Sequence, residues 1–279
     1  MLNLIKRIPD QNLNNEVESF YILENNSSLN LPTEAYRNHP QGTVDIMFAI
    51  EGGIYFTSKK DQEVSLDRIF MIAQQEGMFD ISFKPNSRII GVVLYPECFR
   101  KLFNFPIAEI SNNGERLYDF LGSTYRDCYE KLAEAKDDEH IFKLMSDLFQ
   151  SELTNGDQFE SHFDKMVAHI RKTNGNVSIE SIANMSNLSI RTLQRKMNTH
   201  VGISAKSYSN VVRFRHAVTL IRNHPEMNWQ DILFICGYFD QAHFIKEFRK
   251  YTGNSPSQFV KTDHPLAKFF VDNPPDLSE

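Results

Sequence analysis

The stretch from Ser178 to Met197 has the sequence SIESIANMSNLSIRTLQRKM, which predicts two short helices joined by a turn at Asn187-Leu188. Ser189 suits the start of the second helix, because its hydroxyl can accept from the free amides of the next turn. Three residues of the first helix fall on one face at helical spacing: Ile179, Ile182 and Ala183. The stretch therefore predicts a helix-turn-helix unit.

The second helix of this unit divides into an inner and an outer face. We expect Ile190, Leu193 and Met197 to point inward, since they recur at positions i, i+3 and i+7. The outer face keeps side chains that donate and accept hydrogen bonds: Arg191, Thr192, Gln194, Arg195 and Asn198. Such groups suit purine edges and phosphates, and a solvated helix surface is the alternative for a single unit of this kind.

A second unit of the same kind follows. The segment Trp229–Gly237 predicts a buried helix that ends where Gly237 can take a positive φ. Asp240 then caps another helix, on which Phe244 and Phe248 are expected to point inward. The residues left on its outer face are Gln241, Ala242, His243, Ile245 and Lys246. Two such units in tandem favour a protein that holds two helices against one stretch of DNA.

The two units together resemble the DNA-binding domain of the AraC/XylS family of transcription regulators, over about residues 160–262. The resemblance rests on these positions: Ala183, Ser189, Leu193, Arg195, Gly202, Ser204, Tyr208, Arg213, Ala217, Ile232, Gly237, Tyr238, Asp240, His243, Phe244, Phe248, Arg249, Gly253, Ser255, Pro256 and Phe259. Leu233 and Met197 depart from the family, which usually has Ala and Phe there. Both remain apolar, so we expect local repacking and the same fold.

The resemblance implies sequence-specific regulation of transcription by binding double-stranded DNA. The outer face of the first unit would enter one major groove and that of the second unit the next, held apart by a connecting helix over about Ser207–Asn223. That helix would span roughly 25 Å, against the ~34 Å repeat of the groove. The side chains of Ala242 and Ile245 cannot form hydrogen bonds with bases, so the first unit is expected to be the main base reader.

Charge is distributed unevenly along the chain. The whole sequence holds 30 Lys+Arg and 36 Asp+Glu, a net charge of −6. Residues 161–264 hold 14 basic and 7 acidic residues, a net charge of +7, which leaves −13 for the rest. A basic region confined to the two units is expected for phosphate contact. We expect about half of the following residues to contact phosphate and the others to be solubilising surface charges: Arg171, Lys172, Arg195, Lys196, Lys206, Arg213, Arg215, Lys246, Arg249 and Lys250.

Length and composition favour a two-domain intracellular protein. A chain of 279 residues with 41% hydrophobic residues suffices for two globular domains. Its three cysteines, Cys98, Cys128 and Cys236, are widely spaced and predict no disulfide framework. We find neither the apolar run of a signal peptide nor the ~20 apolar residues of a membrane span. We expect a cytoplasmic protein with no membrane partner.

Residues 1–105 are expected to be rich in β-structure. Six short apolar runs are separated by turn signals: Val17–Leu23, Val44–Ile50, Gly53–Phe56, Arg68–Ala73, Phe79–Phe83 and Arg88–Tyr95. They predict a small antiparallel β-barrel or sandwich. By analogy with the AraC/XylS family, this would be a cupin-like domain for sensing or dimerisation.

No catalytic or metal-binding constellation is evident, so we expect neither enzyme activity nor a cofactor. His39 is the only histidine before residue 140, and a cupin metal site needs clustered ligands. Asp45 lies within an apolar run, which a position on the wet face of a sheet explains. An apolar or aromatic effector could occupy a barrel lined by Ile46, Phe48, Ile54, Phe56, Phe83, Ile90 and Val92. The alternative is that these side chains fill the core themselves.

From about Gly114 to Phe163 the apolar pattern becomes helical. One stripe is Leu117, Phe120, Leu121, Tyr125, Cys128 and Leu132, and the other is Ile141, Leu144, Met145, Leu148 and Phe149. We therefore expect a helical hairpin with its linker over 106–158. In the AraC/XylS family such helices dimerise the protein or pack against the DNA-binding part, and the alternative is that they cover the barrel. The linker is expected near Leu153–Asp157. The DNA-binding domain would follow at 159–264, with an acidic tail at 265–279.

The expected fold class is therefore α+β and multidomain: a small antiparallel barrel or sandwich with a helical hairpin, then an all-α tandem helix-turn-helix domain. We expect an activator whose N-terminal part modulates its output, with a small-molecule effector, a homodimer and, by family analogy, RNA polymerase as further partners. The alternative is an effector-independent regulator or interaction protein whose N-terminal half docks a protein partner.

Overall fold

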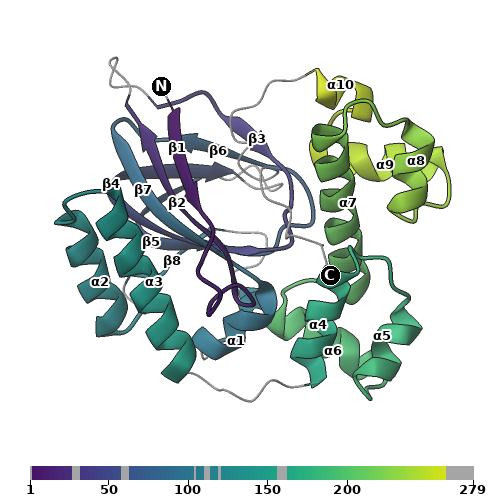
Figure 1. Cartoon of the computed structure of the whole chain (residues 1–279), viewed down its shortest axis with the longest axis horizontal. Helices are drawn as coiled ribbons and strands as arrows, with labels where there is room; N and C mark the ends of the chain where they lie inside the picture. The colour runs from purple at the N-terminus through teal and green to yellow at the C-terminus, as the bar shows by residue number, and fades with distance from the viewer. Residues whose placement is uncertain are drawn as a thin grey trace.

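A computed structural model describes residues 2–26, 32–57, 63–103, 105–109, 114–118, 121–155 and 162–261. Figure 1 shows a curled sheet with helices on its outer face, and beside it a separate group of helices arranged around one long helix. The sheet comes from the N-terminal half of the chain and the helical group from the C-terminal half. This is the predicted α+β arrangement of two unlike domains.

The sheet is antiparallel throughout, with the strand order β1-β2-β7-β4-β5-β8 and a side branch in which β6 pairs with β3 and β4. Its strands are β1 (Leu2–Arg7), β2 (Val17–Asn25), β3 (Tyr36–Asn38), β4 (Val44–Thr57), β5 (Glu63–Ile72), β6 (Phe79–Phe83), β7 (Ser87–Leu94) and β8 (Gly114–Arg116). The predicted short runs thus become one sheet. The short strands β1 and β3 were not predicted.

A bend at Gly52 and Gly53 makes one strand of two predicted runs. Both glycines have positive φ, and a Cβ on Gly53 would lie 2.2 Å from the carbonyl oxygen of Leu66. Before the bend β4 pairs with β7, and after it β4 pairs with β6, while β5 pairs with both halves. The bend therefore lets β4 take part in both sides of the curled sheet.

The same bend separates the predicted effector residues. The register shifts between Ala49 and Ile54, so the alternation of faces changes along β4. Ile46 and Phe48 pack in the outer cluster under the helices, whereas Phe56 and Phe83 pack in the inner cluster of the curled sheet. All four are buried. They do not line one cavity.

Asp45 also differs from expectation. It does not lie on a wet outer face; it shares the inner side of the sheet with Met47, and the Tyr21 hydroxyl donates to its Oδ1 over 2.9 Å. The prediction was wrong because the inner side of this sheet is not uniformly apolar.

Helices α1 (Phe99–Leu102), α2 (Ser123–Ala133) and α3 (Asp138–Asn155) lie against the outer cluster, so α2 and α3 form the predicted hairpin and cover the sheet. Two 3₁₀ turns, η1 (Pro96–Cys98) and η2 (Ile107–Glu109), precede it. The prediction of helix at Gly114 was wrong, because Gly114–Arg116 pairs with β5. Phe120, the linker residues after Asn155 and the tail at 265–279 lie outside the described residues.

The C-terminal half consists of short helices around α7. They are α4 (His162–Lys172), α5 (Ile179–Met185), α6 (Ile190–His200), α7 (Ala205–Asn223), α8 (Trp229–Ile235), α9 (Gln241–Thr252) and α10 (Pro256–Val260). Their apolar side chains form a single core cluster, in which Tyr208 and Phe214 of α7 are fully buried. The connecting helix α7 begins two residues before its predicted start.

The two halves are joined by buried ion pairs. Arg215 of α7 makes two hydrogen bonds of 2.7 Å to Glu18 of β2, and Arg171 of α4 bonds Glu97 of η1 at 2.8 Å. The Arg171 guanidinium also lies 3.5 Å from the centre of the Tyr95 ring. Both arginines belong to the set from which phosphate contacts were expected, but their charges face the acidic N-terminal half.

Further contacts close the same interface. Arg100 of α1 bonds Asp164 of α4 at 2.8 Å. The ring of His39, in the loop before β4, packs edge-on against Phe214 and Phe259. The N-terminal sheet therefore touches α4, α7 and α10, which are the helices that support the two helix-turn-helix units.

Among the described residues, no helix is long and apolar enough to cross a membrane. Cys98, Cys128 and Cys236 are free and buried.

Candidate nucleic-acid interface

The first helix-turn-helix unit consists of α5 and α6, and its local structure follows from its caps. The Ser178 side chain accepts from the Ser181 amide and starts α5. Asn187 has a φ of 53°, the left-handed conformation that asparagine tolerates best after glycine, and it turns the chain between the helices. The Ser189 hydroxyl then accepts from the Thr192 amide over 3.2 Å and starts α6, as predicted.

Helix α6 has the expected division of faces, with one exception. Leu193 and Met197 are buried in the domain core. Ile190 was predicted to point inward but is 56% exposed, because the first residue of α6 stands at the edge of the contact with α5. The exposed polar side chains on this helix are Arg191, Gln194, Arg195 and Asn198.

Polar residues of α6 also contact one another. Gln194 Nε2 lies 3.4 Å from Asn198 Oδ1, one helical turn away. Thr192 is half-buried, and its hydroxyl lies 3.0 Å from that of Ser189. Gln194, Arg195 and Asn198 therefore present a continuous polar face, while Thr192 belongs partly to the cap.

Replacing Ser189 by alanine should lower the free energy of unfolding by about 0.5–2 kcal/mol, because the Thr192 amide loses its acceptor. Urea unfolding of the full chain measures this. Ser181→Ala is the matched control, since Ser181 uses only its backbone amide and lies exposed within α5. Equal midpoints for the two variants would contradict a capping role for Ser189.

The second unit consists of α8 and α9. Gly237 has a φ of 66° after α8, as predicted, and a Cβ there would lie 2.7 Å from Asn176 Oδ1. The Asp240 carboxylate accepts from the His243 amide over 2.7 Å and starts α9. Gly253, with a φ of 75°, ends that helix. The two units therefore have the same arrangement of cap, helix and turn.

Phe244 and Phe248 fix the inner face of α9 in the core, as predicted. The exposed residues of the helix are Gln241, Ala242, His243, Lys246, Arg249 and Lys250. Ile245 is half-buried and packs against the core, so it does not stand fully on the outer face. His243 Nε2 lies 4.0 Å from the buried carboxylate of Glu247, which accepts a bond of 2.7 Å from the Tyr238 hydroxyl.

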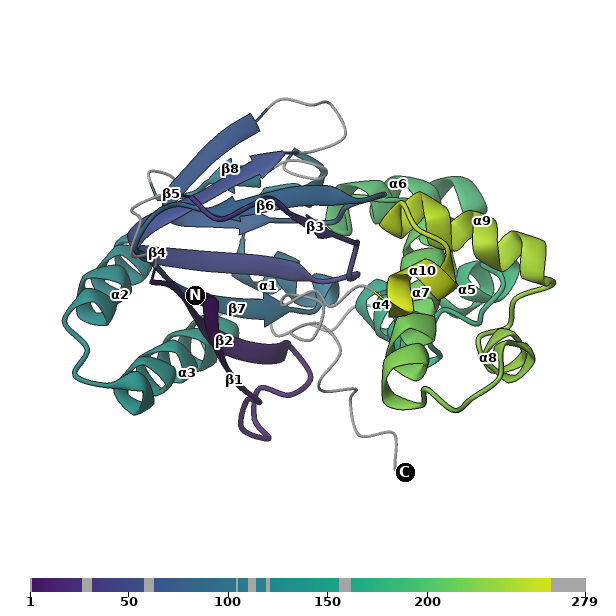
Figure 2. The same cartoon turned by 90° about the horizontal axis from the view of Figure 1, so that it is seen from above.

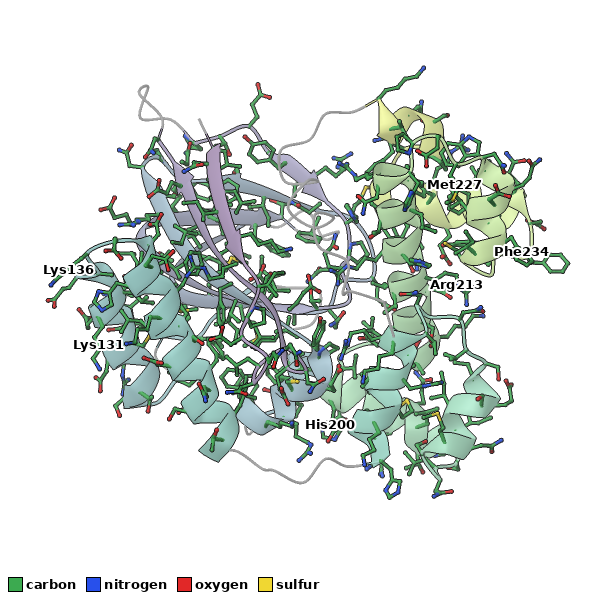
Figure 3. The ribbon with its side chains drawn as sticks, in the orientation of Figure 1. Lys131, Lys136, His200, Arg213, Met227 and Phe234 are labelled. Carbon is green, nitrogen blue, oxygen red and sulfur yellow. The ribbon has the colours of Figure 1, made fainter. Side chains whose placement is uncertain are left out.

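The prediction that α8 is a buried helix was wrong. Of its residues only Ile232 is buried, and Phe234 is 87% exposed. Figure 3 shows Phe234 at the end of α8, pointing away from the rest of the protein. Phe239, in the turn before α9, is 93% exposed. The apolar run of α8 has no periodicity strong enough to separate its two faces.

Arg213, predicted to contact phosphate, lies between the two units instead of on an outer face. It is half-buried in the middle of α7 (Figure 3), and its Nη2 donates to the Gly175 carbonyl over 3.1 Å. Its guanidinium also lies 5.6 Å from the centre of the Tyr238 ring. Arg213 therefore ties α7 to the loop before α5 and to the turn before α9.

Helix α7 separates α6 from α9 and places both on one side of the domain. Figure 1 shows α6 near one end of α7 and α9 near the other, and Figure 2 shows both helices along the same edge. The 19 residues of α7 correspond to roughly 28 Å of helix. That length is close to the ~34 Å repeat of the major groove.

No group of three or more His, Cys, Asp or Glu side chains able to hold a metal ion occurs in the part of the chain that the structure describes. The helix faces could be predicted from the sequence, whereas the interdomain ion pairs were not predicted. The acidic balance of the N-terminal half was the one signal for them.

Two families match separate parts of the chain. Residues 182–262 match a family described as a helix-turn-helix domain. Residues 6–115 match a domain of unknown function, DUF6597. The first match runs from within α5 to the end of α10, and the second covers most of the sheet.

Curated relatives resemble the C-terminal part. The HTH-type transcriptional activator RhaS of Enterobacter sp. (strain 638) is 37% identical over 82 residues, which are 29% of this chain and 29% of that protein. The protein of the same name from Escherichia fergusonii is 39% identical over 82 residues, with the same two shares. The chain thus matches under a third of the length of these relatives. Among solved structures, ToxT from Vibrio cholerae aligns with 98% of this chain and 99% of its own at 11% identity and a TM-score of 0.48.

Proposed function

We propose, from the premise that the C-terminal domain of this chain belongs to the AraC-type helix-turn-helix family, that the protein is a sequence-specific DNA-binding regulator of transcription. The observation that supports this best is the pair of capped helices α6 and α9, which lie along one edge of the domain (Figure 2) and each carry exposed polar side chains. A protein of this kind is a binder and not an enzyme.

In this proposal α6 enters one major groove with Arg191, Gln194, Arg195 and Asn198, and the half-buried Thr192 stands at its edge. Arginine can bond guanine with two hydrogen bonds, and glutamine can do the same with adenine. The exposed Ile190 adds an apolar group beside them, suited to a thymine methyl.

Helix α9 enters the adjacent groove with Gln241, His243 and Lys246, while Arg249 and Lys250 contact phosphates. Its outer face carries fewer side chains that can form two hydrogen bonds with a base. We therefore expect α9 to contribute more to affinity and α6 more to sequence preference.

The buried interface supports modulation by the N-terminal domain. Glu18 and Glu97 hold arginines of α7 and α4, and these helices carry the two units. Any change in the sheet that moves Glu18 or Glu97 must move α7 or α4, or break an ion pair.

A small-molecule effector, a homodimer and RNA polymerase remain proposed partners. Because its proposed target is DNA, we propose that the protein is cytoplasmic. We also propose that it activates transcription, because the curated relatives are named as activators.

A second candidate is an interaction protein that docks a protein partner, with DNA binding secondary. The exposed Phe234 and Phe239 favour it, because large aromatic side chains are rarely left in water.

Selection of genome fragments by the purified full-length protein at near-physiological salt tests the regulator proposal. We expect a motif of two short blocks about one helical turn apart. Recovery of unrelated fragments, with or without candidate effectors, would contradict sequence-specific binding and favour the interaction protein.

Lys250→Ala should weaken binding to all DNA sequences alike, because a phosphate contact carries no base information. The slope of the logarithm of affinity against the logarithm of salt concentration should become shallower by about one unit. Lys136→Ala is the matched control: Figure 3 shows Lys136 on the far side of the protein from α9, and it is exposed. A slope that changes equally in both variants would argue against a Lys250 phosphate contact.

A further inference from the structure

A small cavity lies on the inner side of the curled sheet, at the end that faces α7. Its volume is about 40 Å³. Its walls come from the loop Pro40–Thr43, from β4 and the end of β5, and from β6; the side chains used below are Gln41, Asp45, Met47, Ile72 and Phe79. A water needs roughly 10–15 Å³ of such space, so the cavity holds about three non-hydrogen atoms without rearrangement.

The carboxyl group at this cavity is held in place by a specific arrangement of three strands. The Tyr21 side chain of β2 crosses β7 at Gly91, where a Cβ would lie 2.0 Å from the tyrosine Cζ. Only a glycine leaves room for the ring there. Its hydroxyl reaches Asp45 of β4 and donates to Oδ1 over 2.9 Å.

A second oxygen at the cavity can accept a hydrogen bond, namely that of the Gln41 amide. Gln41 uses its Nε2 to donate to the His39 carbonyl over 3.2 Å, while its Oε1 is buried without a partner among the described residues. Gln75 likewise uses its Nε2 on the Ala73 carbonyl. A buried acceptor without a donor destabilises a folded protein, so Gln41 Oε1 favours a ligand that donates.

Asp45 forms no ion pair with any described residue, and Arg215 of the adjoining helix is already bound to Glu18. The charged and titratable groups that act on Asp45 are Tyr21 and Glu18 of β2 and Lys6 of β1. Burial raises the pKa of Asp45 to about 8, the Tyr21 hydrogen bond and Lys6 oppose this, and Glu18 adds to it.

We propose that this cavity binds the ammonium group of a small organic amine, with Asp45 as its counter-ion and Gln41 Oε1 as a further acceptor. An ammonium group has three donors and no acceptor, which matches the Asp45 carboxylate and Gln41 Oε1. A carboxylate or phosphate has no N–H donor for these two oxygens, and an ionised Asp45 would repel it. The apolar side chains Met47, Ile72 and Phe79 would contact the one or two carbons attached to the nitrogen.

The cavity is coupled to the DNA-binding half through its own wall. The Gln41 carbonyl accepts from Arg215 Nη1 over 3.5 Å, and a Cβ on Gly42 would lie 3.4 Å from Val212 Cγ2 of α7. An amine that pulls Gln41 toward Asp45 therefore acts on the loop that touches α7. This consequence rests on the proposed regulator function, whereas the binding itself does not.

Ethylammonium, with three non-hydrogen atoms, is the probe, and ethanol is its uncharged counterpart. Binding to the full chain can be followed by NMR of methyl-labelled methionines, because Met47 lines the cavity while Met145 is buried on the outer side of the sheet. For so few atoms we expect a dissociation constant on the order of 1 mM. Ethylammonium should shift the Met47 resonance to saturation, leave that of Met145 unchanged, and exceed ethanol in affinity.

The pH dependence adds an independent readout. Below its pKa Asp45 is protonated, so binding an ammonium group must release that proton. The affinity for ethylammonium should therefore rise about tenfold per pH unit up to pH about 8 and then level off. Ethanol should show no such rise.

Asp45→Asn keeps the shape of the cavity and removes the charge. It should weaken ethylammonium binding at least about tenfold and abolish its pH dependence. Asp127→Asn, an exposed position on α2, is the matched control and should bind as the unchanged protein does. A thermal transition and a dispersed methyl spectrum establish that each variant is folded.

Three results would each overturn the proposal: no Met47 shift, equal affinity for ethanol and ethylammonium, or unchanged binding by Asp45→Asn. The fragment selection described above contains no amine-specific step. An amine site in a protein that selects no DNA motif, or a DNA motif without an amine site, would therefore separate the two proposals.

Discussion

Replacing Arg215 by alanine is expected to lower the free energy of unfolding by about 3–5 kcal/mol, because it leaves the buried carboxylate of Glu18 without its partner. The side chain of Glu18 is 8% exposed and that of Arg215 18% exposed, so water cannot replace the lost hydrogen bonds. Urea unfolding of the full chain, followed by circular dichroism, measures the loss.

A double variant separates the ion pair from its surroundings. Glu18→Gln combined with Arg215→Met removes both charges and should recover most of the stability that Arg215→Ala loses. Arg126→Ala, an exposed position on α2, is the control for loss of a positive charge. If Arg215→Ala unfolded at the same urea concentration as Arg126→Ala, the buried pair would not join the two halves.

The same pair predicts a dependence on pH. Burial by itself opposes ionisation of Glu18, but the charge and hydrogen bonds of Arg215 outweigh it and hold the pKa of Glu18 below its usual value. A carboxyl with a lowered pKa stabilises the folded state above the unfolded pKa of about 4.3 and stops doing so as pH falls through its folded pKa. The gap in stability between the unchanged protein and Arg215→Ala should therefore narrow as the solution is acidified below that range.

Replacing Gln194 or Arg195 by alanine is expected to weaken binding to the selected DNA site by about 1–3 kcal/mol and to leave binding to unrelated DNA nearly intact. Both side chains are exposed on α6, and neither supports the core. Fluorescence anisotropy with the selected duplex and a scrambled duplex, at one salt concentration, gives both affinities.

The comparison of the two duplexes is what identifies a base contact. A loss shared equally by both would indicate a phosphate contact, as expected for Lys250. If Gln194→Ala and Arg195→Ala kept the original site preference, α6 would not be the helix that reads bases, and α9 with Gln241 and His243 would have to be.

Local features of the C-terminal half could be predicted from the sequence because they depend on neighbours along the chain. Ser189 and Asp240 cap helices through amides three residues later, and Gly237 takes its positive φ within the turn it makes. Spacing also placed Leu193 and Phe248 in the core. The prediction that Ile190 points inward was wrong, because periodicity gives the side of the helix on which a residue lies but not how far the neighbouring helix α5 extends along it.

Features that depend on contacts between distant segments could not be predicted. The bend at Gly52 and Gly53 changes which face of β4 its side chains occupy, so alternation alone placed Phe48 and Phe56 on one side. The position of Asp45 depends on a tyrosine from another strand. The arginines that bind Glu18 and Glu97 could not be told from the other basic residues of the domain, since the acidic balance of the N-terminal half does not identify which residues pair.

Glu18 and Arg215 are separated by 197 positions, and this has a consequence for how the protein is made. At 5–20 residues per second, a ribosome needs roughly 10–40 s to pass from one to the other. Throughout that interval the nascent sheet carries carboxylates that only later segments neutralise. The carboxylates of Glu18 and Glu97 therefore gain their partners only when α7 and α4 have been synthesised. A chain truncated before α4 would leave both carboxylates in water.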